Sequence, residues 1–226
     1  MHRQQVEELG FAVMPGIFEE DRITLLAENL AAAKLRRSRG GVRHALGYSA
    51  VASLANDPQL LEIARHILDM NAYPFRATMF EKTTDANWLV VWHQDTALPL
   101  RRREETPGCG PWSIKEGVIY AHAPATALSQ VLALRVHLDD STSQNGPLRV
   151  LPATHTLGVL SDEEIHQIAQ EVAPAECCVP RGGIVAMKPL VVHSSSKSQS
   201  ECARRVLDIE YAANTAIAGG LELAVA

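Results

Sequence analysis

The sequence Trp92-His93-Gln94-Asp95 decides the expected fold, because a metal-binding pattern follows directly on an apolar run. Residues 88–92 are aromatic, aliphatic and β-branched, which predicts a buried strand. Side chains alternate between the two faces of a strand, so His93 and Asp95 are expected to point the same way. The pair predicts two ligands of a metal site, with a structural hydrogen-bonded pair as the alternative interpretation.

A third ligand follows about a hundred residues later in the chain. Residues 183–187 predict a second apolar strand, and the apolar residues 189–192 then lead to His193. Two neutral imidazoles and one carboxylate on one side of a metal leave the other side open, which suits non-haem Fe(II) in oxygen chemistry. By residue type alone His155 competes with His193, but His155 follows a polar turn rather than a buried strand.

An arginine pair marks the start of the strand that follows the third ligand. A polar segment, residues 194–200, leads to Arg204 and Arg205. A guanidinium at this place can bind a carboxylate beside the metal, because its planar fork matches two carboxylate oxygens. Arg204 shares a strand face with Asp208 and Glu210, whereas Arg205 shares a face with the apolar residues. If the apolar face of this strand lined the barrel interior, Arg205 rather than Arg204 would bind the carboxylate.

These motifs resemble those of the phytanoyl-CoA dioxygenase family, whose members are Fe(II)- and 2-oxoglutarate-dependent oxygenases. The resemblance spans residues 82–211, more than half of the chain, and its motifs are specific only together. The residues that carry it are Lys82-Thr83, Asn87-Trp88, Trp92-His93-Gln94-Asp95, residues 145–155, and His193 with Arg204.

The resemblance implies a mainly β fold with flanking helices, the double-stranded β-helix or jelly roll of cupin-like proteins. Iron would be held by His93, Asp95 and His193. The chain would form one domain over residues 1–226, with a mainly helical part in residues 1–72 and a jelly-roll core in residues 73–215.

The resemblance also implies a place for 2-oxoglutarate, which would chelate the iron through its keto acid end. Its far carboxylate would be held by Arg204, eleven residues after the distal histidine. This spacing favours Arg204 over Arg205. Lys82 and Ser195 are further candidates for cofactor binding, although Lys82 near the end of its strand could equally face solvent.

The implied reaction consumes 2-oxoglutarate and O2, releases succinate and CO2, and hydroxylates a C–H bond of a small-molecule substrate. Family relatives that halogenate have a small residue in place of Asp95, so Asp95 favours hydroxylation. One alternative is a non-redox cupin-like protein that binds a metal or ligand through the same three side chains and has no need of Arg204. Another is a metal-dependent hydrolase with Asp139 as general base.

Composition limits the classes of protein to which the chain belongs. It has 226 residues, a formal net charge of −5 and a pI near 6.0. This balance argues against a general nucleic-acid binder, which needs clustered positive charge. The chain shows neither a bilayer-spanning run nor a signal-peptide core. We expect a cytoplasmic protein with free thiols that binds neither nucleic acid nor a membrane, and its oligomeric state stays open.

Periodicity and capping residues predict the elements around the motifs. Helices are predicted over residues 6–10, 19–30 and 57–69, and from Ser161, which forms a capping box with Glu164. Strands are predicted over residues 75–82, 130–140 and 148–151. A mobile loop is predicted over residues 36–48, and a long loop over residues 96–125, where Leu98, Trp112 and Tyr120 would help to form the substrate mouth.

Overall fold

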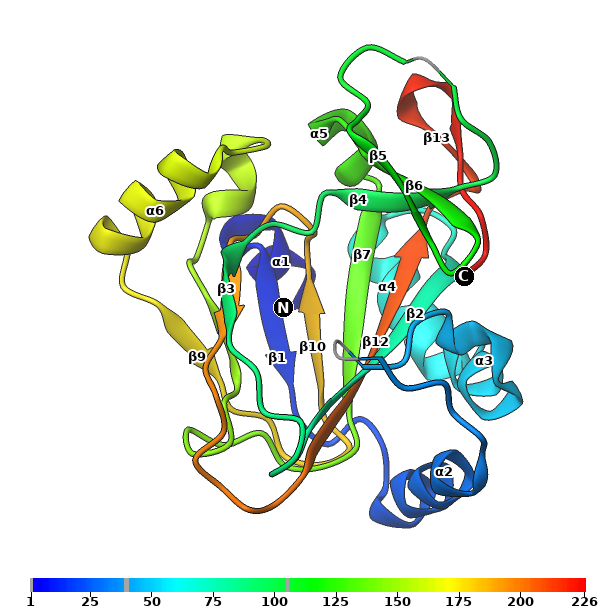
Figure 1. Cartoon of the computed structure of the whole chain (residues 1–226), viewed down its shortest axis with the longest axis vertical. Coiled ribbons are helices and arrows are strands. Elements are labelled where there is room, and N and C mark those ends of the chain that lie inside the picture. Colours follow the sequence, from blue (N-terminus) through cyan, green and yellow to red (C-terminus); the bar gives the residue numbers. More distant parts are fainter. Residues whose placement is uncertain (1, 39–40, 105) are drawn as a thin grey trace.

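Two antiparallel β-sheets face each other, with helices packed on the outer side of the larger one (Figure 1). The computed structural model describes residues 2–38, 41–104 and 106–226. In spatial order, the large sheet contains β1 (Phe11–Met14), β10 (Ile184–Met187), β7 (Val131–His137), β12 (Arg204–Ala212) and β2 (Tyr73–Lys82). The small sheet contains β3 (Val90–His93), β11 (His193–Ser195), β8 (Leu148–Val150) and β9 (Ala175–Cys177).

The chain passes back and forth between these two sheets. It runs from β2 to β3, from β3 to β7, from β7 to β8, and from β9 through β10 and β11 to β12, changing sheet at each of these steps. This alternation is the connectivity of the double-stranded β-helix, so the predicted fold class is confirmed. It also brings β3 and β11 side by side, although they lie far apart in the sequence.

Two of the helices begin where the capping residues predict. Asp57 accepts a hydrogen bond from the backbone of Gln59, and Ser161 and Glu164 form the predicted capping box. The helix at residues 49–55 was not predicted. The helices are α1 (His2–Leu9), α2 (Glu20–Ala32), α3 (Ser49–Ala55), α4 (Pro58–Leu68), α5 (Ala125–Leu128) and α6 (Asp162–Glu171), with short 3-10 turns at Ala45–Gly47, Thr154–Leu157 and Ala218–Gly220.

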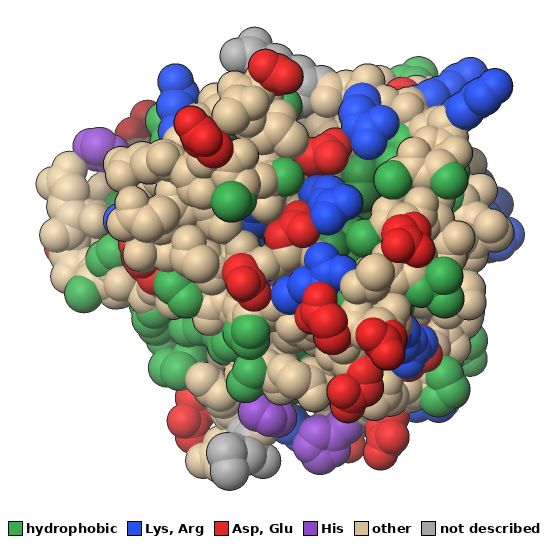
Figure 2. Space-filling view, turned by 90° about the horizontal axis from the view of Figure 1, so that it is seen from below, with side chains coloured by type: hydrophobic (Ala, Val, Ile, Leu, Met, Phe, Trp, Pro, Cys, Tyr) green, Lys and Arg blue, Asp and Glu red, His purple; other side chains and the backbone are tan. Residues whose placement is uncertain are grey.

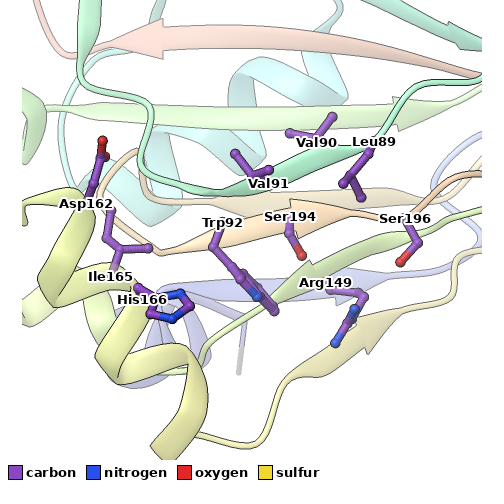
Figure 3. Close-up of a pocket in the computed structure, with 10 residues that line it drawn as sticks. All are labelled: Leu89, Val90, Val91, Trp92, Arg149, Asp162, Ile165, His166, Ser194 and Ser196. Carbon is purple, nitrogen blue, oxygen red and sulfur yellow. The ribbon is translucent and has the colours of Figure 1, made fainter.

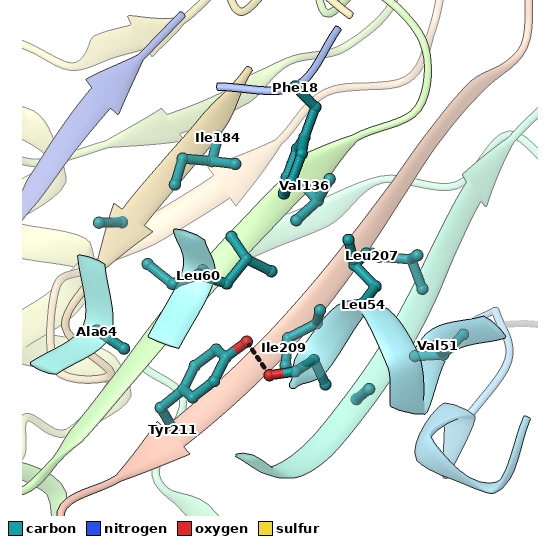
Figure 4. Close-up of a cluster of buried hydrophobic side chains, with 14 of the residues drawn as sticks. Phe18, Val51, Leu54, Leu60, Ala64, Val136, Ile184, Leu207, Ile209 and Tyr211 are labelled. Carbon is teal, nitrogen blue, oxygen red and sulfur yellow. Dashed lines mark hydrogen bonds between the residues drawn. The ribbon is translucent and has the colours of Figure 1, made fainter. Parts of the chain in front are cut away.

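The main apolar core lies between the large sheet and helices α2 to α4, outside the barrel. Leu207, Ile209 and Tyr211 on β12 pack here with Leu54 and Leu60 from the helices (Figure 4). Because side chains alternate along a strand, the polar residues of β12 therefore face the barrel interior. Alternation left open which face of β12 lines the interior. The helices cover the apolar face, so the polar face, which carries Arg204, lines it.

Replacing Tyr211 with phenylalanine is expected to lower the free energy of unfolding by about 1–3 kcal/mol. The buried Tyr211 hydroxyl donates a hydrogen bond to the backbone oxygen of Ala55 (Figure 4), and the substitution leaves that oxygen without its partner. Tyr73→Phe is the matched control, because the Tyr73 side chain is 47% exposed, and it should change stability by less than about 0.5 kcal/mol. Urea denaturation of both variants is the measurement, and equal losses would contradict the expectation.

The segment after Asp95 is not the unstructured loop predicted from its prolines. It contains a three-stranded sheet of β4 (Ala97–Leu100), β6 (Val118–His122) and β5 (Trp112–Lys115), in that spatial order. Leu98 and Trp112 pack on one side of this accessory sheet, against the C-terminal β13 (Ala216–Ile217) and β14 (Leu221–Glu222). Of the three residues predicted at the substrate mouth, only Tyr120 lies on the opposite side.

Residues 36–48 are only partly a free loop. Val42 forms an antiparallel bridge with Met79 on β2, and the His44 ring hydrogen-bonds the Tyr120 hydroxyl at 3.1 Å. Residues 39 and 40 lie outside the described part of the chain. This segment is therefore held at the edge of the large sheet on both sides of that gap.

Charges of both signs are intermingled on the lower face of the molecule, as Figure 2 shows. Ion pairs at the lower ends of the strands include Arg205 with Asp139 at 2.7 Å and Arg37 with Glu81 at 2.9 Å. None of the helices formed by the described residues is long and apolar enough to cross a membrane. Cys177, Cys178 and Cys202 are free thiols, as predicted.

Candidate metal centre

His93, Asp95 and His193 meet at the end of the paired strands β3 and β11. Their ligand atoms all lie within 4.8 Å of one another, and within the described residues this is the one cluster of three or more His, Cys, Asp or Glu side chains able to hold a metal. Asp95 oxygens lie 3.7 Å from Nε2 of His93 and 3.4 Å from Nε2 of His193. The fold thus brings the three predicted side chains together.

Hydrogen bonds fix which ring nitrogen of each histidine is available. Nδ1 of His93 lies 2.8 Å from the Val91 carbonyl oxygen, and Nδ1 of His193 lies 2.9 Å from the Val191 carbonyl oxygen. A carbonyl only accepts, so each Nδ1 carries the proton and donates it, which leaves the Nε2 lone pairs directed at Asp95. Both imidazoles are thereby prepared to act as metal ligands.

Electrostatics favour the protonation states that metal binding needs for His93 and Asp95. Burial and the neighbouring His193 lower the pKa of His93, which favours the neutral ring. Burial opposes ionisation of Asp95, but His193, His93 and Arg76 together hold its pKa below the usual range. The site therefore offers a neutral His93 imidazole and an ionised Asp95 carboxylate near neutral pH, as divalent metals require.

Strand β3 is an exposed edge strand rather than the buried strand predicted from its apolar residues. The side chains of Leu89 and Val91 are 58% and 68% exposed. The prediction was wrong because β3 lies at the edge of the small sheet, where one side of the strand has no neighbour. Apolar composition alone does not distinguish an edge strand from a central one.

A β-bulge in β3 sets the direction of His93. His193 pairs with His93, but Ser195 pairs with Val90, so one extra residue stands in β3 between the two pairs. Without the bulge, Val90 and His93 would lie on opposite faces, whereas here both line the inner pocket. Simple counting of alternate residues does not reveal this register shift.

Gln94, between the two β3-side ligands, points away from the metal cluster and fixes the strand end. Its amide nitrogen donates to the backbone oxygens of Gly158 and Leu190, and its side-chain oxygen accepts from the backbone of Leu160. The Asp95 backbone also donates to Pro189. These bonds hold the ligand pair against two other segments of the chain.

Two buried cations share the inner pocket with the metal cluster. Lys82 on β2 and Arg204 on β12 are neighbours in the strand register, and both line this cavity of about 80 Å³. In the part of the chain that the structure describes, neither side chain has a carboxylate within ion-pair distance, and the Nε atom of Arg204 has no hydrogen-bond partner. A buried cation without a counter-ion is costly, so this place favours an anionic ligand.

Ser195 holds the Lys82 ammonium in position. Lys82 donates to the Ser195 hydroxyl at 2.7 Å and to the backbone oxygen of Ser196, and Ser195 donates to the Gly146 carbonyl. Ser194 and Ser195 belong to strand β11, not to the predicted polar loop. A side chain on Gly146 would approach the Ser196 oxygen to 2.2 Å, which explains why glycine stands there. His193 likewise begins β11 rather than ending an apolar run.

The two candidate arginines have different surroundings. Arg204 is 4% exposed and lines the inner pocket. Arg205 points outward, where its guanidinium donates two hydrogen bonds to Asp139. Asp139 is therefore occupied by Arg205 and is not among the residues that line the pocket, so the geometry removes the general base of the hydrolase alternative.

The barrel interior also contains two buried ion pairs that the sequence did not reveal. Arg76 pairs with Glu210, and Arg135 pairs with Asp208 at 3.0 Å. Both pairs join neighbouring strands, and burial raises the pKa of each carboxyl group. Along the strands, the pair of Arg135 and Asp208 lies between two ends of the interior. Lys82 and Arg204 are at one end, and Arg76 is at the other. A salt-bridge partner is not readable from strand periodicity because it depends on register.

His155, the competing third ligand, and two further histidines lie away from the cluster. His155 interacts with the Glu7 backbone oxygen, so the geometry does not bring it to the cluster. His122 lies 2.6 Å from the Thr96 hydroxyl on the accessory sheet. His137 is buried in the barrel, where burial and Arg135 lower its pKa to about 3.

A larger pocket, of about 450 Å³, lies on the outer face of the small sheet beneath α6 (Figure 3). Trp92, His166 and Ile165 line it, and the Arg149 guanidinium lies 5.2 Å from the centre of the Trp92 ring. None of the three clustered ligands reaches this pocket. The smaller inner pocket is therefore the candidate site, because it holds the metal cluster and the two uncompensated cations.

Comparison with protein families now decides the family. The sequence profile of the family described as phytanoyl-CoA dioxygenase (PhyH) matches residues 6–206. The chain belongs to the phytanoyl-CoA dioxygenase family. The profile match covers every residue of the metal cluster and both pocket cations, and the resemblance that the motifs indicated is confirmed.

One curated relative of this chain is L-proline trans-4-hydroxylase from Streptomyces griseoviridis. The two sequences are 28% identical over an alignment of 188 positions that covers 71% of this chain. The chain spans 62% of the length of that relative.

Solved structures with the same fold include three that bear directly on the architecture. AviO1 from Streptomyces viridochromogenes Tue57 has a TM-score of 0.67 at 20% identity, with 93% of each chain covered. EctD from S. alaskensis with 2-oxoglutarate and 5-hydroxyectoine has a TM-score of 0.71 at 19% identity, covering 93% of this chain and 74% of that one. The epimerase SnoN in complex with Fe3+, alpha ketoglutarate and nogalamycin RO has a TM-score of 0.71 at 19% identity, covering 95% and 83%.

Proposed function

We propose that this protein is an Fe(II)- and 2-oxoglutarate-dependent dioxygenase that hydroxylates a C–H bond of a small-molecule substrate. The observation that carries the proposal is one cavity holding a two-histidine, one-aspartate cluster together with two buried cations that have no counter-ion among the described residues. The family, the proline hydroxylase relative and the solved structures with iron and 2-oxoglutarate support it. One domain and a cytoplasmic location stay predictions.

The residues of the cluster fit Fe(II). His93, Asp95 and His193 supply two imidazole nitrogens and one carboxylate oxygen, a set that leaves further coordination positions for other ligands. The Nδ1 hydrogen bonds to Val91 and Val191 hold both rings with Nε2 available. When bound, the iron supplies the activation of O2 that the amino-acid side chains alone do not provide.

The pocket cations fit the far carboxylate of 2-oxoglutarate. Arg204 has an unpartnered Nε atom, and Lys82 is oriented by Ser195 at its side. A carboxylate here would neutralise both cations and satisfy donors that are otherwise buried without a partner. We assign Arg204 as the main clamp, with Lys82 and Ser195 in supporting contacts.

The remaining side chains prepare and protect the reaction. Arg76 pairs with Glu210 and Arg135 with Asp208, so that these four interior charges are fixed. Fixed charges in a closed site stabilise a charged ligand at little reorganisation cost. Gln94 keeps the end of β3 in place, which preserves the spacing of the ligand pair.

The test is succinate formation and O2 uptake by the full chain, loaded anaerobically with Fe(II) and given 2-oxoglutarate. Slow turnover without added substrate is expected in the wild type, and it should require both iron and 2-oxoglutarate. Protein that binds iron but neither binds 2-oxoglutarate nor forms succinate would refute the proposal and favour the non-redox cupin-like alternative.

Binding of 2-oxoglutarate is expected to weaken about tenfold as the pH rises through about 8, because one charge-assisted contact is lost. Burial and the neighbouring Arg204 lower the pKa of Lys82 to about 8, so the ammonium is charged below this pH and neutral above it. The bound carboxylate favours the charged form and moves the transition of the complex to higher pH.

Calorimetric titration of the Zn(II)-loaded protein with 2-oxoglutarate across this pH range measures the effect. Lys82→Arg keeps the charge at all these pH values, so its binding should vary little with pH. Lys82→Met should bind weakly throughout. A pH dependence that persists in Lys82→Met would assign the titration to another group.

A further inference from the structure

A second set of charged side chains surrounds Tyr120 near the metal cluster and takes no part in the proposed iron and 2-oxoglutarate chemistry. Lys115 lies 4.8 Å and Arg76 5.9 Å from the centre of the Tyr120 ring. His44 hydrogen-bonds the Tyr120 hydroxyl, and Arg43 precedes it in the chain. Three separate segments, the region around residue 43, strand β2 and the hairpin of β5 and β6, therefore meet here.

This set lies on the metal side of the accessory sheet. Tyr120 pairs with Pro99 and Ser113, so these side chains share one face, and Lys115 lies on the same face two residues after Ser113. The opposite face carries Leu98 and packs against the C-terminal hairpin. Figure 1 shows the β5–β6 hairpin beside the upper end of β2, where Arg76 lies.

A hydrogen bond links this set to the segment that follows Asp95. Arg76 donates a hydrogen bond to the backbone oxygen of Ala97, two residues after Asp95. Arg76 and Lys115 both lie against the Tyr120 ring, so Lys115 belongs to a group of side chains that reaches the segment carrying Asp95.

The charges in this set do not balance. Arg76 is paired with Glu210. Among the residues that the structure describes, Lys115 has no carboxylate within ion-pair distance, and the one carboxylate near Arg43 is Glu116, at 4.0 Å, with both side chains about two-fifths exposed. Arg43 also donates a long hydrogen bond to the Ser38 hydroxyl. An exposed pair at this distance is weak. Two cations are thus free to bind an acidic group that enters from solvent.

We propose that Lys115 and Arg43 bind an acidic group of the substrate, so that the enzyme selects a small carboxylate over its neutral analogue. The inference rests on the proposed function and names the substrate class of that same site. The Tyr120 ring supports the Lys115 ammonium, and its hydroxyl is fixed by His44, so Tyr120 is a positioning residue. The proline hydroxylase relative acts on an amino acid, which carries such a group.

The selectivity follows from the partly buried position of Lys115. A carboxylate replaces water around the ammonium with a charge-assisted hydrogen bond, whereas an amide of the same shape leaves the cation unpaired. A site built for a polar group rejects the analogue that lacks it. We expect the amide to bind about 10- to 100-fold more weakly than the acid.

The test uses matched compounds that differ only in the acidic group: L-proline, L-leucine and benzoate, each with its primary amide, and inorganic phosphate as a separate arm. Calorimetric titration of the full chain loaded with Zn(II) and 2-oxoglutarate measures binding. At least one acid should bind more tightly than its amide, and Lys115→Met should weaken that acid about 10- to 100-fold. Lys34→Ala, at an exposed lysine away from this set, is the control and should not change binding.

Lys115→Met keeps the aliphatic chain on the Tyr120 ring, and a melting curve equal to that of the wild type excludes misfolding. Arg43→Gln should weaken the same acid. The inference would be overturned if acid and amide bound equally, or if none of the three acids bound. It would also be overturned if only phosphate bound more tightly, or if binding were unchanged in Lys115→Met. Succinate formation by the wild type without substrate tests the proposed function separately, so the two failures are distinguishable.

Discussion

Replacing His193 with alanine is expected to reduce iron- and 2-oxoglutarate-dependent succinate formation by at least about a thousandfold, because a metal centre contributes several kcal/mol to catalysis. His193 is 4% exposed, and its Nε2 faces Asp95 at 3.4 Å. Without it, the cluster has one imidazole and one carboxylate, and the side chains no longer hold three positions of the metal.

His155→Ala is the matched control for this experiment. His155 was the competing third ligand in the sequence, but its ring contacts the Glu7 backbone oxygen outside the cluster. The control should retain activity and metal content. Metal content after desalting, measured by elemental analysis, should fall only in His193→Ala. An active His193→Ala enzyme, or an inactive His155→Ala enzyme with native stability, would reverse the assignment.

Replacing Arg204 with alanine is expected to raise the KM for 2-oxoglutarate about a hundredfold or more, since truncating one partner of a buried charge pair costs about 2–5 kcal/mol. Arg204 lines the pocket and has no carboxylate partner among the residues that the structure describes, so its donors are available to a ligand. Burial and Arg135 lower the Arg204 pKa to about 10, which still leaves it charged near neutral pH.

Arg205→Ala, one residue along the strand, is the control. Arg205 binds Asp139 on the outer side, so its loss should lower stability without changing the KM for 2-oxoglutarate by more than about twofold. Steady-state kinetics at saturating O2 measures both variants. A larger KM effect in Arg205→Ala than in Arg204→Ala would show that the apolar-face interpretation of β12 was correct after all.

The sequence predicted those features that depend on residue type and local position, such as metal ligands and helix caps. Two histidines and an aspartate at strand ends predicted the cluster, and Asp57 and Ser161 predicted two helix starts, because capping depends only on local residues. The choice between Arg204 and Arg205 was open from alternation alone, since either face of β12 could have been buried. Helices α3 and α4 decide it by covering the apolar face.

Features that depend on register or on sheet position were not readable. The apolar residues of β3 indicated a buried strand, but the strand is at an edge. Ser194 and Ser195 were assigned to a polar loop because serine is common in turns, yet they lie in β11, where Ser195 binds Lys82. The pairing of Arg76 with Glu210 depends on which residues stand opposite each other across two strands.

The bulge in β3 has a consequence for how this gene can vary through evolution. The side chain of Val91 is 68% exposed, so many amino acids are tolerated there without loss of packing. Val91 and Trp92 together stand opposite the single residue Ser194, so an in-frame deletion of the Val91 codon would remove the bulge, keep both flanking pairs and leave His93 on the same face as Val90. Between these two pairs, the chain can therefore vary in length by one residue as well as in amino-acid identity.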